Sequence, residues 1–333
     1  MLLFIYNSLD AQTKGTSTNP YILNPVPGSV AWGYYWSEAT PALRVQSGDY
    51  VMVRTLITST AERLEGAGVL PGQVEKELRE VQVVKDKGPG NHILTGPIYI
   101  ENAEPGDILE IHFVSIQPAI PYGYNGIGQS GFLSDEIFER KMKIIFFDTI
   151  KMIGHFADGI EIPLHPFFGS VGVAPPKEAG RWSSAPPWIH GGNLDNKELT
   201  AGTSLFLPVH IRGALLEIGD GHAAQGNGEV DITAIETSLK GTLQLIVHKG
   251  KTILWPRAET PTHIITMGCD RDLNAAAHIA VREMIRYLMD EKKLSKADAY
   301  MLCSVAVDVN ITQLVDGNVG VHAMLPKNIF LKK

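Results

Sequence analysis

The sequence predicts a mainly β protein, a sandwich or barrel-like β-rich scaffold, with an α+β subdomain near the C-terminus. Most of the 333 residues fall into short runs that alternate apolar and polar side chains, and turns rich in Gly and Pro separate these runs. This pattern is typical of a sandwich or barrel and not of alternating βαβ units. A helical period of three to four residues begins only at Asp270.

The strand pattern is clearest at residues 108–113. Leu109, Ile111 and Phe113 lie on one predicted face, and the polar residues between them lie on the other. A Pro-Gly turn at residues 104–107 precedes this strand. The other predicted strands have a similar length and composition: residues 50–56, 143–147, 204–210, 214–218, 230–235 and 242–247.

Two helices and a strand pair are predicted in the last quarter of the chain. The apolar residues of the first helix recur every three or four positions: Leu273, Ala277, Val281, Met284 and Leu288. A second helix begins at Ser295, where Ser295 and Asp298 have the spacing of a capping box. Residues 306–324 then form two strands that turn near Asp316 and Gly317.

We expect a tail at residues 1–15, a β-rich lobe at 16–168 and a second β-rich lobe at 169–333, with an α+β insertion at about 257–310. The two lobes are expected to form one catalytic unit. A cytoplasmic location is predicted, or a periplasmic or secreted one if residues 1–11 are the remnant of a signal peptide. Neither membrane insertion nor membrane binding is expected, because every apolar stretch is shorter than the roughly 18 residues of a spanning helix.

The charge balance argues against a nucleic-acid partner. Lys and Arg number 29 against 36 Asp and Glu, which gives a net charge of −7, and the basic doublets at 140–141, 292–293 and 332–333 are isolated from one another. Binding to a phosphate backbone needs clustered Lys and Arg. The two cysteines, Cys269 and Cys303, have no disulfide or zinc-finger spacing, and their placement favours buried structural thiols over nucleophiles.

Several common active-site motifs are absent from the sequence. H-E-x-x-H, the P-loop and G-x-S-x-G do not occur. Residues 126–131 match G-x-G-x-x-G, but they follow a Pro/Tyr/Gly segment at 118–125 that we interpret as a loop. A dinucleotide site needs a strand that leads directly into the motif, so we interpret these residues as a surface loop.

Polar residues concentrate between residues 190 and 229. Residues 190–196 place polar side chains around a Gly-Gly pair, and Asp220, His222 and Glu229 are expected at the tip of a hairpin. If the backbone is extended at Asp220 and His222, the two side chains point the same way and can share one divalent ion. Both segments are equally consistent with ordinary solvated turns, since Asp, Asn and Gly are common turn residues.

Five segments together resemble the acetamidase/formamidase family: residues 92–97, 103–107, 190–196, 219–229 and 313–318. The resemblance extends from about Ser47 to the C-terminus. It implies a β-rich fold with an α+β insertion and hydrolysis of short aliphatic amides to carboxylate and ammonia. It also implies a bound metal and a homodimer or higher homo-oligomer.

We assign roles on this basis. A metal held by Asp195, Asp220 and His222 would polarise the amide carbonyl and activate water, with zinc favoured over calcium because His222 supplies nitrogen. Glu229 would act as general base and then as general acid. The substrate-binding residues are expected to be His190 and Asn193, and His92 is a reserve ligand.

Two rival functions remain open at this stage. One is a metal-independent hydrolase that uses Cys269 or a serine, and the other is a non-catalytic module that binds small ligands. The second is motivated by two departures from the family pattern: Asn227 stands where members usually have Asp, and residues 57–59 lack the acidic or histidine residues often found there.

Overall fold

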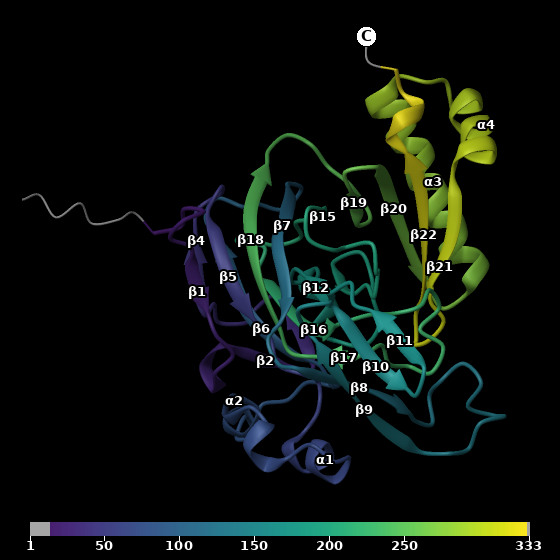
Figure 1. The fold of residues 1–333 in the computed structure, drawn as a ribbon. Coiled ribbons are helices and arrows are strands. Elements are labelled where there is room, and N and C mark those ends of the chain that lie inside the picture. The colour runs from purple at the N-terminus through teal and green to yellow at the C-terminus, as the bar shows by residue number, and fades with distance from the viewer. Residues whose placement is uncertain (1–13, 332–333) are drawn as a thin grey trace, which may run out of the picture.

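The computed structural model describes residues 14–331. It confirms a mainly β fold made of two large sheets and a small third sheet (Figure 1). The signal-remnant hypothesis concerns residues 1–11, which lie outside the described part. Within that part, no helix has both the length and the apolar character needed to cross a membrane.

The first sheet has nine strands. In spatial order they are β1 (Tyr21–Leu23), β5 (Tyr50–Arg54), β18 (Leu239–His248), β7 (Ile108–Pro118), β15 (Ser204–Pro208), β19 (Arg257–Glu259), β20 (His263–Asp270), β22 (Val319–Pro326) and β21 (Asp308–Gln313). All neighbouring pairs are antiparallel except β1 and β5.

The second sheet has eleven strands. Eight follow one path: β11 (Ile160–Pro163), β10 (Ile153–Ala157), β9 (Lys141–Asp148), β8 (Tyr122–Ile127), β17 (Glu236–Thr237), β16 (Leu216–His222), β12 (Phe167–Gly172) and β14 (Gly191–Asn193). Beside β16 lies β6 (Ile93–Ile100), which also pairs with β2 (Val30–Trp32) and β4 (Leu43–Val45). The third sheet pairs β3 (Tyr34–Trp36) with β13 (Arg181–Ser183).

The main hydrophobic core lies between the two large sheets. Phe113 on β7 and Phe168 on β12 are both fully buried, and their ring centroids are 6.4 Å apart. Burial of such inner faces is what holds a β-sandwich together. In both large sheets, a strand that precedes residue 168 in the sequence pairs with one that follows it: β6 with β16, and β7 with β18. The predicted division into two lobes is therefore a division of the sequence, and it stays a prediction.

Within residues 14–331, four α-helices lie outside the sandwich: α1 (Ala61–Gly66), α2 (Lys76–Val81), α3 (Leu273–Lys292) and α4 (Lys296–Ala306). Figure 1 shows α1 and α2 together near β2, and α3 and α4 beside β20–β22. The capping predictions are confirmed at α4, where Ser295 Oγ accepts from the Asp298 N–H. The Asp272 side chain caps α3 in the same way.

The buried face of α3 is rotated relative to the predicted one. The fully buried residues are Ala276, Ala280, Met284 and Leu288. Small alanines face the sheet because α3 approaches β20 very closely. A Cβ built on Gly268 would lie 2.3 Å from the Ala276 carbonyl oxygen. The predicted helical period of α3 was therefore correct. The face that packs against the sheet is determined by side-chain size as well as by hydrophobicity.

The other strand predictions are mostly confirmed, with three corrections. The strand predicted at 214–218 extends through His222 as β16, and residues 230–235 form turns and irregular structure instead of a strand. The segment 118–125 is not a loop throughout, because β8 begins at Tyr122. From β8 the chain passes into antiparallel β9 without a helix, so the G-x-G-x-x-G match lacks a dinucleotide-binding context.

Candidate active site

Neighbouring strands of the eleven-stranded sheet bring distant parts of the sequence together. On β16, His222 is opposite Glu236 of β17 on one side and Phe167 of β12 on the other. Strand β14 then pairs Asn193 with Ser170 of β12. Asp220 and His222 therefore lie within a buried strand, and the prediction that they sit at a hairpin tip is wrong.

Three acidic residues of the site have left-handed backbone conformations. The φ angles are 44° at Asp195, 54° at Asp220 and 44° at Glu229, and the side chains are almost fully buried. A residue with a Cβ at such an angle costs about 1–3 kcal/mol, and such strain occurs often at functional sites. The surrounding structure therefore holds these three residues in backbone conformations that they would not adopt readily on their own.

Two carboxylates converge on the Nε2 atom of His222. Asp220 Oδ2 and Glu236 Oε1 each lie 3.3 Å from it, yet Nε2 has no hydrogen-bond partner of acceptable geometry. Two ligands bound at about 2.0–2.1 Å to one tetrahedral zinc ion would be about 3.3 Å apart. The spacing of these three residues therefore fits a shared metal ion.

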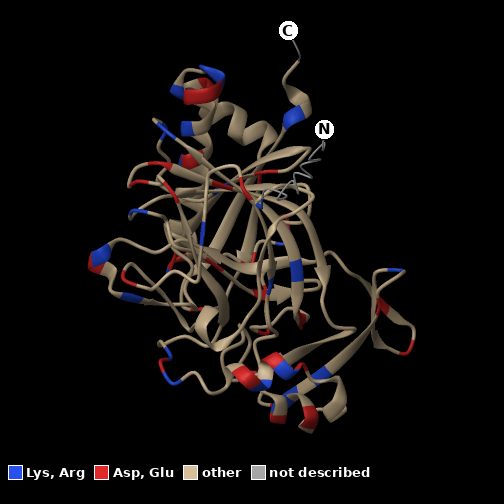
Figure 2. Cartoon of the chain, turned by 90° about the vertical axis from the view of Figure 1, so that its left-hand side faces the viewer, with Lys and Arg blue, Asp and Glu red and all other residues tan. Residues whose placement is uncertain are grey.

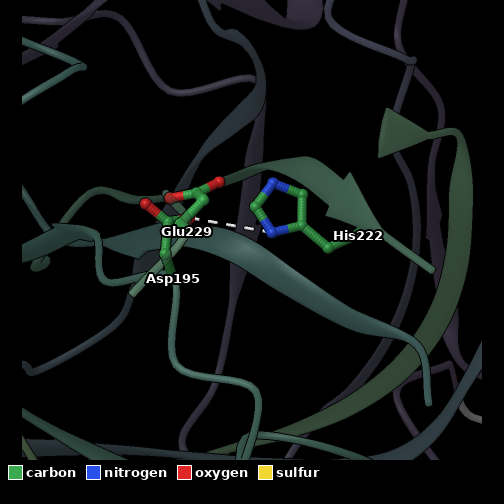
Figure 3. Close-up of side chains that lie close together, drawn as sticks. All are labelled: Asp195, His222 and Glu229. Atoms are coloured by element: carbon green, nitrogen blue, oxygen red, sulfur yellow. Dashed lines mark ion pairs between the residues drawn. The ribbon is translucent and has the colours of Figure 1, made fainter. Parts of the chain in front are cut away.

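Asp195 and Glu229 form another acidic pair beside the imidazole (Figure 3). Asp195 Oδ1 lies 3.8 Å from His222 Nδ1, and Glu229 lies in the same group of potential ligands. The predicted trio Asp195, Asp220 and His222 is thus divided between two groups that share His222. The group that contains Asp220 and His222 also includes Glu236, a residue to which the sequence analysis assigned no role.

Asp195 is held by two amide side chains. Asn193 Nδ2 donates to Asp195 Oδ2 over 2.7 Å, and Gln313 Nε2 donates to the same oxygen over 2.8 Å. The other oxygen, Asp195 Oδ1, is buried without a partner. Asn193 is itself fixed by a hydrogen bond from Ser170 Oγ to its Oδ1.

Buried carboxylate oxygens without hydrogen-bond partners indicate a cation-binding site. Asp195 Oδ1, Glu229 Oε2 and Glu236 Oε2 are all buried acceptors that have no hydrogen-bond partner. Leaving such groups unpaired is costly, and a cation is the partner that several carboxylate oxygens and an imidazole nitrogen share most readily. The donor set therefore fits a divalent metal ion.

Burial and mutual interactions shift the pKa values of the site. Burial raises the pKa values of Asp195 and Glu229 well above the ordinary range, and the pKa of Glu236 is also raised. Burial alone would lower the pKa of His222, but Glu236 and Asp220 outweigh it and raise that pKa. Burial would also raise the pKa of Asp220, but the adjacent His92 and His222 lower it.

Three acids of the site, Asp220, Glu229 and Glu236, line a cavity of about 1120 Å³, whereas Asp195 and His222 lie behind its wall and do not line it. The polar lining includes Asp220, Glu229, Glu236, Asn193, His92 and Asp316. Burial raises the pKa of Asp316 to about 6. Asp316 and Gln313, like Glu236, had no assigned role before, although both belong to a segment that resembles the family.

The structure separates the two predicted substrate-binding residues. Asn193 lines the cavity, whereas His190 does not and lies fully buried against Tyr35, with ring centroids 4.9 Å apart. Burial lowers the pKa of His190 to about 3, so its ring is neutral at pH 7. The reserve ligand His92 contacts Ser184 through Nδ1 and places Nε2 3.8 Å from Asp220 Oδ2.

The positions that depart from the family pattern lie in different surroundings. Asn227 is exposed and does not line the cavity, so its neutral side chain leaves the charge of the cavity wall unchanged. Thr58 and Ser59 do line it. The Thr58 carbonyl accepts a hydrogen bond of 2.6 Å from the Tyr124 hydroxyl, so this wall contributes backbone and hydroxyl groups instead of metal ligands.

Comparisons with known proteins agree with the resemblance. Residues 47–183 and 178–332 match the model of the Acetamidase/Formamidase family. A formamidase from Methylophilus methylotrophus is 27% identical over 193 residues, which cover 42% of this chain and 47% of that protein. An acetamidase from Mycolicibacterium smegmatis is 28% identical over 202 residues, covering 42% and 49% respectively. The chain thus spans about half the length of the curated relatives it matches.

A solved structure extends this similarity to almost the whole chain. The crystal structure of an acetamidase from Bacillus halodurans superposes with a TM-score of 0.80 at 29% sequence identity. The match covers 93% of this chain and 98% of that one. The two-sheet fold described above is therefore shared with that structure over the matched part of the chain.

Proposed function

Because the chain belongs to the acetamidase/formamidase family, we propose that it hydrolyses the C–N bond of small linear aliphatic amides to a carboxylate and ammonia. The observation that carries this proposal is the convergence of His222 with buried, partly unpartnered carboxylates, of which Asp220, Glu229 and Glu236 line a large cavity. Relatives named formamidase and acetamidase give the reaction class.

We assign the metal to the group formed by Asp220, His222 and Glu236, since the two carboxylate oxygens lie 3.3 Å from His222 Nε2. Asp195 is proposed as a further ligand, because a Cβ built on Gly169 would lie 2.6 Å from Asp195 Oδ1 and 2.7 Å from Asp220 Oδ2, which shows that these two oxygens lie close to each other. The imidazole nitrogen favours zinc over calcium, which prefers oxygen ligands alone. When bound, such an ion polarises the amide carbonyl and makes water easier to deprotonate.

Glu229 is the proposed general base. It lines the cavity, its Oε2 atom has no hydrogen-bond partner, and burial together with the neighbouring Asp195 raises its pKa, which makes the carboxylate a stronger base. It takes a proton from the attacking water while the water oxygen bonds to the carbonyl carbon. It then returns that proton to the amide nitrogen, so that the C–N bond breaks and ammonia leaves.

Asn193 is the proposed substrate donor. One N–H of its amide is used by Asp195, which leaves the second N–H of the same nitrogen for the substrate carbonyl oxygen. A single donor of this kind contributes about 3 kcal/mol to transition-state stabilisation. We propose that His190 supports the wall behind Asn193, since the ring packs against Tyr35 and Gly192.

The test is ammonia release from formamide and acetamide by the wild type and by Glu229→Gln. We expect turnover to fall about 10²–10⁴-fold in the variant with metal content preserved. Glu217→Gln is the matched control, because Glu217 is also a buried acid with a pKa raised by burial but does not line the cavity. Unchanged turnover in Glu229→Gln would remove Glu229 from the mechanism.

The same assay decides against the non-catalytic alternative. A protein that binds amides measurably but releases no ammonia from formamide, acetamide or their homologues would be a binding module. A homo-oligomeric state and a cytoplasmic location remain part of the proposal. Sedimentation of the purified protein tests the first, and fractionation of cells tests the second.

A further inference from the structure

The cavity carries opposite charges at its floor and at its rim. Its acidic residues are buried or half-buried, whereas three basic residues that line the same cavity are exposed: Arg63, Lys87 and Arg271. They come from α1, from the segment before β6 and from the residue after β20. The cavity therefore has a cationic rim, by which we mean these three residues.

The cationic rim lacks ion-pair partners. Within residues 14–331, no carboxylate lies within 4.0 Å of a side-chain nitrogen of Arg63, Lys87 or Arg271. Nearby acids pair elsewhere: Glu65 binds Arg79, and Asp86 binds Arg181. Figure 2 shows Lys and Arg beside Asp and Glu on several helices and loops. The feature that these three unpaired residues share is that all of them line one cavity.

One member of the rim is fixed at the cavity wall. The Lys87 ammonium lies 3.5 Å from the ring centroid of Trp32, which also lines the cavity. The Gly88 N–H donates to the Trp32 carbonyl over 2.7 Å and anchors this segment. A cation–π contact holds an ammonium group in place without neutralising its charge. Lys87 therefore remains able to bind an anion.

The cavity is also far larger than the simplest amides require. A water molecule occupies about 30 Å³ in the liquid, and acetamide is only a few times larger, whereas the cavity measures about 1120 Å³. A neutral amide of that size gains nothing from the rim. Resting on the proposed amidase function, we infer that the preferred substrates are linear amides that carry a carboxylate, which the cationic rim binds while the amide lies at the floor.

The test compares two substrates of the same size, succinamate and the neutral diamide succinamide. For the wild type we expect kcat/KM for succinamate to exceed that for succinamide, counted per amide group, by about tenfold or more, as charge-assisted contacts allow. The ratio should fall at 0.5 M KCl, because salt screens exposed charges. The triple variant Arg63→Gln, Lys87→Gln and Arg271→Gln should lose the preference and retain turnover of succinamide.

A second triple variant controls for net charge. Arg44→Gln, Lys177→Gln and Arg212→Gln remove three basic residues that pair with surface acids and do not line the cavity. This variant should keep the preference for succinamate. Equal kcat/KM values for the two substrates in the wild type, or a preference that survives loss of the rim, would overturn the inference.

Calorimetric binding separates this inference from the proposed function. If no amide, neutral or anionic, releases ammonia, the proposed function fails. The rim is then judged by binding alone. Tighter binding of succinamate than of succinamide, lost in the rim variant, supports the cationic rim as an anion site, and equal binding of the two compounds contradicts it.

Discussion

His222 Nδ1 lies 2.9 Å from Gln225 Oε1, and this contact sets the tautomer of the imidazole. The Gln225 amide cannot turn over, because its Nε2 donates to the Asp195 carbonyl over 2.8 Å. Oε1 must therefore accept, and Nδ1 must donate. The lone pair of the neutral ring is thus placed at Nε2, the atom that faces Asp220 and Glu236.

Replacing Gln225 should weaken metal binding without removing a ligand. Gln225→Ala frees Nδ1 and lets the imidazole adopt the other tautomer, so we expect zinc affinity to fall about 10–100-fold. Titration against a chromophoric chelator measures this. Gln244→Ala is the control, since Gln244 also donates to a backbone carbonyl but on β18. Equal affinity in both variants would contradict the role of Gln225.

A single methyl group at Gly169 should close the metal site. A Cβ at Gly169 would lie 2.6 Å from Asp195 Oδ1, 2.7 Å from Asp220 Oδ2 and 2.7 Å from His222 Cε1. All three belong to buried side chains, and Asp220 and His222 lie on β16, so they have little room to move. Gly169→Ala is therefore expected to lose bound metal and ammonia release.

The control for this variant is Gly128→Ala, where a new Cβ would have no atom within 4 Å. Elemental analysis of both purified variants, with circular dichroism to confirm folding, gives the readout. A folded Gly169→Ala protein that binds metal as the wild type does would show that the ion lies elsewhere.

Asp316 should make the metal-free protein less stable at neutral pH. Burial raises its pKa from 3.8 to about 6 in the folded state. The folded protein therefore holds this proton more tightly than the unfolded chain, and the stability that protonation provides is lost as pH rises from about 4 to about 6. The difference of about two pKa units corresponds to about 3 kcal/mol in the free energy of unfolding.

Asp316→Asn should accordingly stabilise the chelator-treated protein by about 3 kcal/mol at pH 7.5 and much less at pH 4.5. Urea denaturation at the two pH values measures the difference. The exposed Asp135, changed to Asn, should have no comparable effect. A gain for Asp316→Asn that is the same at both pH values would contradict the assigned ionisation.

The sequence was sufficient for the fold class because its signals are local. The alternation in residues 108–113 is confirmed by β7, where Leu109, Ile111 and Phe113 are buried. The strand end at His222 was missed because Gly219, Asp220 and Gly221 have turn propensities. Pairing with β12 and β17 overrides those propensities, and such pairing is set by residues distant in the chain.

Dependence on residues that are distant in the sequence also explains which parts of the site could be predicted. Asp220, His222 and Glu229 lie within ten residues of one another, so their proximity was predictable. Glu236 joins them only because β17 pairs with β16, and Gln313 reaches Asp195 from β21 of the other sheet. Neither residue has a local pattern that marks it as a partner. The strand pairing that brings them there is visible only in the folded chain.

Cysteine should be dispensable for ammonia release. Burial raises the pKa of the Cys269 thiol to about 12, so little thiolate exists at pH 7.5, and neither cysteine lines the cavity. The double variant Cys269→Ala and Cys303→Ala is expected to keep kcat within about threefold of the wild type. Removal of the metal from the wild type by a chelator should abolish turnover, and added zinc should restore it. Ammonia release after each treatment, and after thiol alkylation of the wild type, distinguishes the mechanisms. Full activity after chelation together with loss on alkylation would instead establish a cysteine hydrolase, because only a thiolate nucleophile requires the sulfur and not the ion.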